Sequence, residues 1–180
     1  MALPSTVYKA SIQLSDVDRG VYETLQATVA QHPSETAERL VARLLAFAIF
    51  YEPDLAFTKG ICATDEPDLW VKGPDGRVQF WVEVGLPEAE RLIKASRHGE
   101  RVALLACGRA LANWDLQQLP KLERLANLTV ISLDQAFIAQ LAAQLERSIN
   151  WSVTITEGIF YLTLADRTLE TAIHIKTVSR

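Results

Sequence analysis

Cysteine, methionine and histidine are scarce in this chain. Its 180 residues include 2 cysteines, 1 methionine and 3 histidines. Cys62 and Cys107 lack a paired metal-binding spacing, and a chain of this length needs no disulfide to build a core, so we expect two reduced thiols. His32, His98 and His174 form no ligand pattern either, so the sequence indicates neither a thiolate nor an imidazole metal centre.

The chain also lacks a long apolar run and an excess of positive charge. No stretch approaches the roughly 18 uninterrupted apolar residues of a membrane span, and no charged segment followed by an apolar run opens the sequence. We therefore expect a cytoplasmic protein with no membrane partner. A net charge of -4 and a pI near 5.4 exclude a broad positive surface, so any site for DNA or RNA phosphates is expected to be a local patch.

What is present is typical of one globular domain, which we assign to residues 1–180. Hydrophobic residues make up 49% and charged residues 22%, and there is no repeat, low-complexity tract or linker. Alternating apolar residues predict a strand over 5–15, and turn residues after it favour a hairpin with 21–31. A helix is expected from about Glu35 to Tyr51, with Ser34 as N-cap and Glu35 in the first turn.

The second half alternates between helix and strand patterns before it ends in strands. Helices are predicted over 87–98 and 134–148, strands over 101–108 and 128–133, a hairpin around Glu157 and Gly158, and a single last strand over 169–178. The sequence thus predicts an α/β fold (α+β, with a mixed sheet) that carries β-hairpins near both termini.

Two predicted strands carry acidic residues where a core is expected. Across "DLWVKGPDGRVQFWVEVG", a four-residue loop from Pro74 to Arg77 would place Asp68 opposite Glu83, and Trp70 opposite Trp81. Facing carboxylates repel each other unless water, a base or a cation lies between them. This pattern indicates a site for a divalent cation, Mg²⁺ or Mn²⁺.

The first predicted helix offers a third carboxylate. Steps of three and four residues from Glu38 reach Val41, Ala42 and Leu45, so Glu38 is expected on the apolar face and inside the protein. Packed on the sheet, it would complete a Glu38, Asp68, Glu83 oxygen site that suits Mg²⁺.

These segments resemble the YaeQ family, a divergent branch of the PD-(D/E)XK nuclease superfamily. The resemblance covers nearly the whole chain through "HPSETAERLVARLLAFA", "DEPDLW", "WVEVGLPEAERLIKAS" and "VALLACG". It implies a restriction-endonuclease-like core in the order helix, three strands, helix, strand. It also implies metal-dependent hydrolysis of phosphodiesters in DNA or RNA, with Glu38, Asp68 after Pro67, and Glu83 at the motif positions.

One motif position departs from the superfamily pattern. Gly85 stands where a catalytic lysine is expected, two residues after Glu83. Some superfamily members supply this lysine from the next helix, which here carries Lys94. Lys94 is thus the predicted catalytic cation, and Arg91 and Arg97, at three-residue spacings from it, are predicted phosphate ligands.

Three alternatives stay open. Glu83 and Glu38 could pair with Arg91 or Lys94 in a charge network without metal, and the basic end of the 87–98 helix could serve only its macrodipole. The nuclease scaffold could have lost hydrolysis and kept a nucleic-acid-binding or regulatory role. The terminal hairpins could instead dock a protein partner along their open edges.

Overall fold

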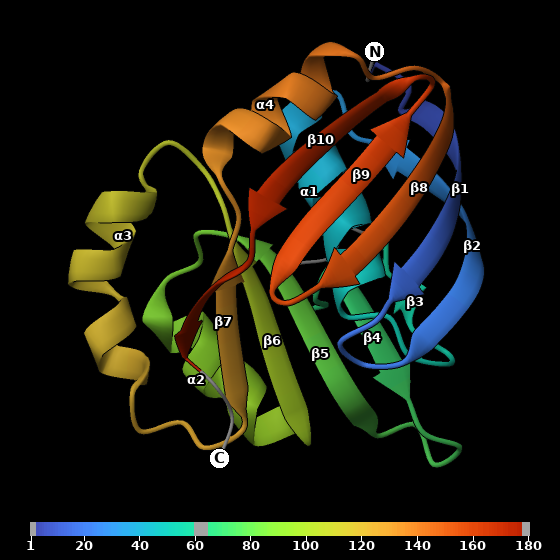
Figure 1. Ribbon diagram of the computed structural model, residues 1–180. Coiled ribbons are helices and arrows are strands. Elements are labelled where there is room, and N and C mark those ends of the chain that lie inside the picture. Colours follow the sequence, from blue (N-terminus) through green and yellow to red (C-terminus); the bar gives the residue numbers. More distant parts are fainter. Residues whose placement is uncertain (1–2, 60–64, 178–180) are drawn as a thin grey trace. The chain divides into compact units, whose positions relative to one another are not determined.

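The computed structural model describes residues 3–59 and 65–177, and Cys62 lies outside these ranges. The chain divides into two compact units, Met1–Leu44 with Leu133–His174, and Leu45–Ser132 with Ile175–Arg180. Both are built from helices and strands, which confirms the mixed α+β class (Figure 1). None of the described helices is long and apolar enough to cross a bilayer.

The first unit holds a sheet that joins strands from both ends of the chain. Its order is β10-β9-β8-β1-β2, and β1 pairs antiparallel with β2 but parallel with β8. The predicted N-terminal hairpin and the hairpin at Glu157–Gly158 are both confirmed. We call this the first sheet; its strands are β1 (Thr6–Asp16), β2 (Val21–Gln31), β8 (Ser148–Thr156), β9 (Ile159–Leu164) and β10 (Arg167–Ala172).

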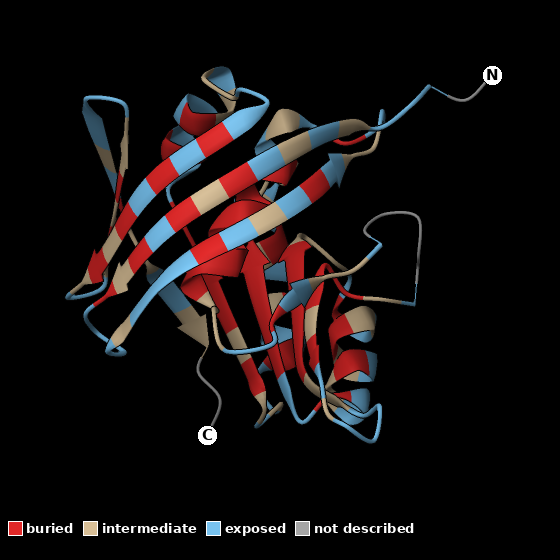
Figure 2. Ribbon diagram, turned by 90° about the vertical axis from the view of Figure 1, so that its right-hand side faces the viewer, coloured by how far each residue is buried: buried red, intermediate tan, exposed pale blue. Residues whose placement is uncertain are grey.

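Alternation along these strands explains why one face of the first sheet is buried. In β1, Ala10, Ile12 and Leu14 are buried, while the odd-numbered residues between them are exposed or half-buried. Figure 2 shows the same striping along the long strands. The period of two that predicted these strands is the one that buries their apolar face. Helix α4 (Gln135–Ala143) belongs to this unit and contributes Phe137, whose ring lies edge-on to that of Phe160.

The second unit holds a mixed sheet of order β11-β7-β6-β5-β4-β3, which we call the second sheet. β5, β6 and β7 run parallel to one another, and β4 runs antiparallel to β5. Its elements are β3 (Ala56–Phe57), β4 (Leu69–Lys72), β5 (Val78–Gly85), α2 (Ala89–His98), β6 (Arg101–Ala106), α3 (Leu111–Gln117), a 3₁₀ helix (Leu119–Leu122), β7 (Leu128–Ser132) and β11 (His174–Thr177).

One element prediction is wrong, and one element was not predicted. The predicted last strand, 169–178, is two strands: β10 pairs with β9 in the first sheet, and β11 joins the second sheet. The residues around Trp114, which had no predicted element, form α3, where the Trp114 ring is buried and its Nε1 donates to the Pro87 carbonyl at 2.6 Å.

Helix α1 (Ala37–Ile49) corrects the view of Glu38. Glu38 is exposed, whereas every residue from Leu40 to Ile49 is buried. Because the helix is buried all round beyond its first turn, an apolar stripe could not reveal which way Glu38 faces. The predicted inward orientation of Glu38 is therefore wrong.

The buried acid at this end of α1 is Glu35, which lies before the helix and not in its first turn. Its carboxylate accepts hydrogen bonds from Arg39 Nη1 and Arg43 Nη2, both at 2.7 Å, and the Glu35 side chain has no exposed surface. The predicted N-cap is also displaced, because Thr36 Oγ1, and not Ser34, accepts from the Arg39 backbone N–H.

We expect Glu35→Gln to lower the free energy of unfolding by about 3–5 kcal/mol, because it leaves the buried Arg43 guanidinium without its counter-ion. Glu38→Gln is the matched control: it makes the same chemical change three residues away on an exposed side chain, and we expect a loss within about 0.5 kcal/mol. Urea unfolding of both variants measures the difference. Equal losses would contradict the assigned role of Glu35.

Candidate functional site

The hairpin of β4 and β5 builds the candidate site. The predicted pairing of Trp70 with Trp81 is confirmed, and Leu69 pairs with Val82 one step along. Asp68 directly precedes Leu69, and its backbone N–H donates to the Val82 carbonyl at 3.0 Å. Asp68 therefore lies beside the strand that carries Glu83.

The turn of this hairpin differs from the predicted one. Gly73 N–H donates to the Arg77 carbonyl at 2.8 Å, which leaves Pro74, Asp75 and Gly76 as a three-residue loop with Gly76 at a φ of 81°. The register then shifts between Val71 and Lys72, where a bulge restores the pairing that the longer loop would have given. The predicted four-residue loop is wrong, but the pairing at the site is unchanged.

Both carboxylates are buried, with 4% exposure for Asp68 and for Glu83. Asp68 Oδ2 accepts a hydrogen bond from the Val84 backbone N–H at 2.8 Å. Glu83 Oε1 accepts two hydrogen bonds at 2.9 Å, from Trp81 Nε1 and from Arg91 Nε. The expected ion pair between Glu83 and Arg91 is therefore present, and Arg91 also donates from Nη2 to the Glu66 carbonyl.

Burial raises the pKa of the Glu83 carboxyl above its ordinary value, because the site disfavours an ionised group. The Arg91 guanidinium and the Trp81 hydrogen bond act in the opposite direction, and the negative charge of Asp68 raises the pKa further. A buried carboxyl whose pKa is raised beside a second acid is a common feature of functional sites.

Gly85 has a backbone conformation that explains the missing lysine. Its φ is 116°, a region that side-chain-bearing residues rarely adopt, although no atom lies within 4 Å of where a Cβ would be. A lysine here would be strained by about 1–3 kcal/mol through its backbone alone. A cation for the site has to come from another position.

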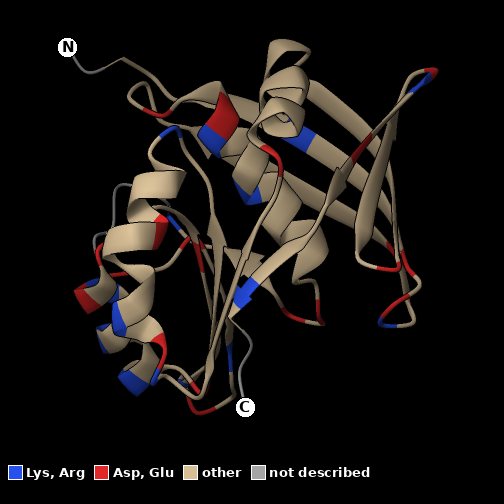
Figure 3. Cartoon of the chain, turned by 60° about the vertical axis from the view of Figure 1, so that its left-hand side comes forward, with Lys and Arg blue, Asp and Glu red and all other residues tan. Residues whose placement is uncertain are grey.

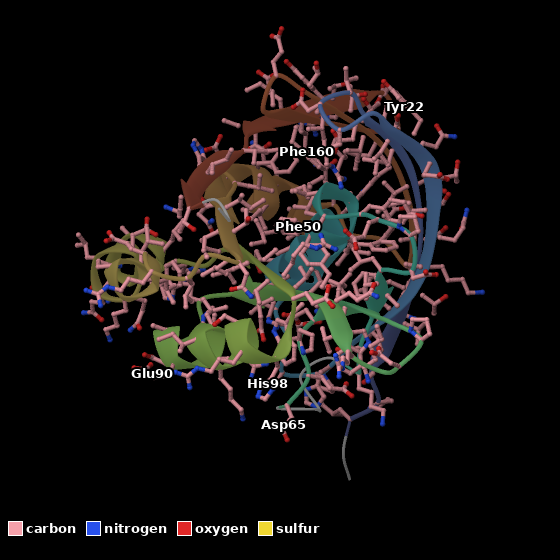
Figure 4. The ribbon with its side chains drawn as sticks, turned by 90° about the horizontal axis from the view of Figure 1, so that it is seen from below. Tyr22, Phe50, Asp65, Glu90, His98 and Phe160 are labelled. Carbon is pink, nitrogen blue, oxygen red and sulfur yellow. The ribbon has the colours of Figure 1, made fainter. Side chains whose placement is uncertain are left out.

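Two cationic side chains of helix α2 line one pocket, whose lining includes neither Asp68 nor Glu83. Arg91 and Lys94 line a pocket of about 380 Å³ together with Asp65, Trp81 and His98. Lys94 is exposed and Arg91 half-buried. Figure 4 shows Asp65 and His98 on the same side of the second unit.

Two of these lining residues had no predicted role, and one predicted residue lies elsewhere. Sequence reasoning did not select Asp65 or His98, although His98 lies four residues after Lys94 and thus on the same helix face. Arg97 is exposed but does not line the pocket, because six residues at about 100° each place it roughly 120° away from Arg91 around the helix axis. The lining of the pocket gives no support to the predicted contact between Arg97 and a phosphate.

The predicted ligands thus divide between the two units. Asp68, Glu83, Arg91 and Lys94 belong to the second unit and Glu38 to the first. Among residues 3–59 and 65–177, no group of three or more His, Cys, Asp or Glu side chains is arranged to hold a metal ion.

Two carboxylates are nevertheless a donor set that Mg²⁺ accepts. This ion is usually held by one or two carboxylates together with waters and phosphate oxygens. Arg91 and Trp81 both bond to Oε1 of Glu83, and Asp68 accepts from the Val84 N–H through Oδ2. Asp68 and Glu83 supply the carboxylate oxygens that such an ion takes as ligands.

Comparison with known proteins matches this site and its surroundings to one family. A family model described as "YaeQ protein" matches residues 1–173, a range that includes α1, the β4–β5 hairpin and α2. The chain belongs to the YaeQ family. It is 37% identical to YaeQ of Escherichia coli (strain K12) and 39% identical to YaeQ of Salmonella typhi, each over 171 residues that cover 94% of both chains.

Solved YaeQ structures share the fold. The crystal structure of YaeQ from Pseudomonas syringae matches with a TM-score of 0.93 and 42% identity, over 99% of each chain. YaeQ from Xanthomonas axonopodis pv. citri matches with a TM-score of 0.91 and 35% identity, over 95% of this chain and 97% of the other. The architecture described above is therefore that of YaeQ proteins.

The raised pKa of Glu83 predicts how stability depends on pH. The folded protein binds this proton more tightly than the unfolded chain, so the stabilisation by protonated Glu83 is full below the ordinary pKa of 4.5 and is lost as pH rises through the raised value. We expect the stability of wild type relative to Glu83→Gln to fall over this window, as measured by urea unfolding across a pH series.

Asp68→Asn provides the control for this titration. Removing the negative charge of Asp68 should bring the pKa of Glu83 closer to 4.5. The pH range over which stability falls should then become narrower. A stability difference that grows with rising pH would contradict the assigned environment of Glu83.

Proposed function

We propose that this protein is a metal-dependent phosphodiesterase that acts on nucleic acid, with Asp68 and Glu83 as the carboxylates that bind Mg²⁺ or Mn²⁺. The observation that carries the proposal is the burial of both carboxylates beside each other at the β4–β5 hairpin, where the charge of Asp68 raises the pKa of Glu83. Such a pair costs stability unless a cation relieves it.

The surrounding residues have roles that suit this chemistry. A divalent cation, when bound, would activate water and stabilise the negative charge that develops on the phosphate. Arg91 and Trp81 hold Glu83 in one orientation through Oε1. Lys94, exposed at the mouth of the adjacent pocket, can bring a positive charge to a phosphate there.

The order of elements supports a restriction-endonuclease-like core. α1, β3, β4, β5, α2 and β6 follow one another as helix, three strands, helix, strand. Glu38, which α1 leaves exposed, belongs to the first unit and is not part of the proposed pair of ligands.

A second candidate is a protein that binds nucleic acid without cleaving it. The observation that favours it is Gly85, whose backbone conformation disfavours the lysine of the superfamily motif, together with the ion pair that already compensates Glu83. In this case Arg91 and Lys94 would bind phosphate and no hydrolysis would follow.

The metal site is tested by titration calorimetry with Mg²⁺ and Mn²⁺. We expect saturable binding to wild type and none to Asp68→Asn, because the variant loses one of two anionic ligands. Asp75→Asn is the matched control, since it removes an exposed carboxylate from the turn of the same hairpin and should leave binding unchanged. Absence of saturable binding to wild type would refute the metal-dependent proposal.

The role of Lys94 is tested by cleavage assays on single- and double-stranded DNA and RNA with metal present. Lys94→Ala should reduce the rate about 100-fold and leave metal binding intact, because it removes one group that stabilises the transition state. Arg97→Ala, three residues along the same helix and outside the pocket, should have a much smaller effect.

The same variants separate the two candidate functions. If wild type does not cleave but Lys94→Ala weakens its binding to nucleic acid, the binding role replaces the nuclease. If wild type cleaves and Lys94→Ala keeps the full rate, another cation serves the site.

A further inference from the structure

A second cavity lies in the first unit, at the start of β8. It has a volume of about 620 Å³ and is lined by the end of α4, by residues 144–151 and by the β9–β10 turn. These segments meet at the top of the sheet in Figure 1. The size is within the range of about 300–1,000 Å³ that is usual for ligand sites.

The first half of β8 has an open backbone edge in this cavity. β8 starts at Ser148, but its pairing with β9 starts only at Ser152, opposite Thr163. β9 then leaves the edge after Leu164 through a turn in which Ala165 has a φ of 51°. Within the described residues, no strand therefore lies beside Ser148–Asn150 on this side.

The direction of the open groups follows from the pairing with β1. Lys9 N–H donates to the Arg147 carbonyl at 2.9 Å, and Val17 N–H donates to the Ile155 carbonyl at 2.8 Å, so the odd-numbered residues of this segment face β1. Because backbone groups alternate sides along a strand, the N–H and C=O of Ser148 and Asn150 face the opposite way. The cavity thus presents two donors and two acceptors at the spacing of a strand.

The rest of the cavity wall combines apolar side chains with the polar Gln144 and three charged residues. Leu141 and Trp151 are almost completely buried, and Leu145 and Leu164 are half-buried. The charged lining residues Glu146, Asp166 and Arg167 are all exposed. Charges are sparse on the strands of this sheet in general (Figure 3).

We infer that this cavity binds an extended peptide segment of a partner protein, which adds a strand beside Ser148–Asn150 in the position that β9 vacates. Its backbone pairs with the outward groups of Ser148 and Asn150, and one apolar side chain packs against Leu141, Leu145 and Trp151. Strand addition takes its affinity from main-chain hydrogen bonds and its specificity from pockets for alternate side chains, and the cavity offers both. This site is independent of the phosphodiesterase proposal.

The experiment starts from a phage-displayed library of random peptides selected on the wild-type protein. The selected sequences should carry apolar residues at alternate positions, and a synthetic peptide of this kind should bind in calorimetry. Hydrogen exchange of the complex should show new protection at the amides of Ser148 and Asn150.

Two variants of Ser148 form a matched pair. Ser148→Pro removes the outward N–H without touching the ladder to β1, and should weaken peptide binding about tenfold or more. Ser148→Ala keeps that N–H and should bind as wild type does. Leu145→Asp, which places a charge on the apolar wall, should also abolish binding and supports the site if Ser148→Pro fails to fold.

Three outcomes would overturn the inference. One is a selection that enriches no peptide above background. Another is a peptide that binds Leu145→Asp and both Ser148 variants as tightly as wild type, or that protects other amides. The last is a concentration-dependent dimer of the chain that Leu145→Asp or Ser148→Pro dissociates, which would assign the edge to a second copy.

Discussion

The guanidinium of Arg91 holds the candidate site together, because it bonds at once to Glu83 on β5 and to the Glu66 carbonyl just before β4. These two segments approach each other with a buried acid on each side. Burial raises the pKa of the Glu83 carboxyl, and the positive charge of Arg91 acts against this effect. The position of α2, which carries Arg91, therefore matters for the protonation of Glu83.

Local sequence patterns predicted most of the elements, because the same patterns determine which side chains are buried in the structure. Alternation of apolar residues located β1, β2, β8 and β9, because the same alternation buries one face of the first sheet. The register at Trp70 and Trp81 followed from turn chemistry, even though the loop is shorter and a bulge makes up the difference. Gly85 was recognised as a departure from a motif, but only its φ of 116° gives the physical cause.

What the sequence could not give depends on long-range contacts. The break between β10 and β11 is invisible in a run that alternates throughout, because the two halves join different sheets. Glu35 and Glu38 are the same residue type, and only Glu35 forms the buried ion pairs with Arg39 and Arg43. His98 and Asp65 come together with Lys94 only through the packing of α2, so spacing along one helix could not find all of them.

The parallel pairing of β1 with β8 sets the order in which the protein can fold during synthesis. Lys9 and Ser148 are neighbours in the sheet but lie more than a hundred residues apart in the chain. The hairpin of β1 and β2 therefore leaves the ribosome long before its partner exists, with the apolar faces of both strands uncovered. Non-local pairings of this kind slow folding and prolong the exposure of aggregation-prone strands. The pairing partner of β1 on this side is thus absent until β8 has been translated.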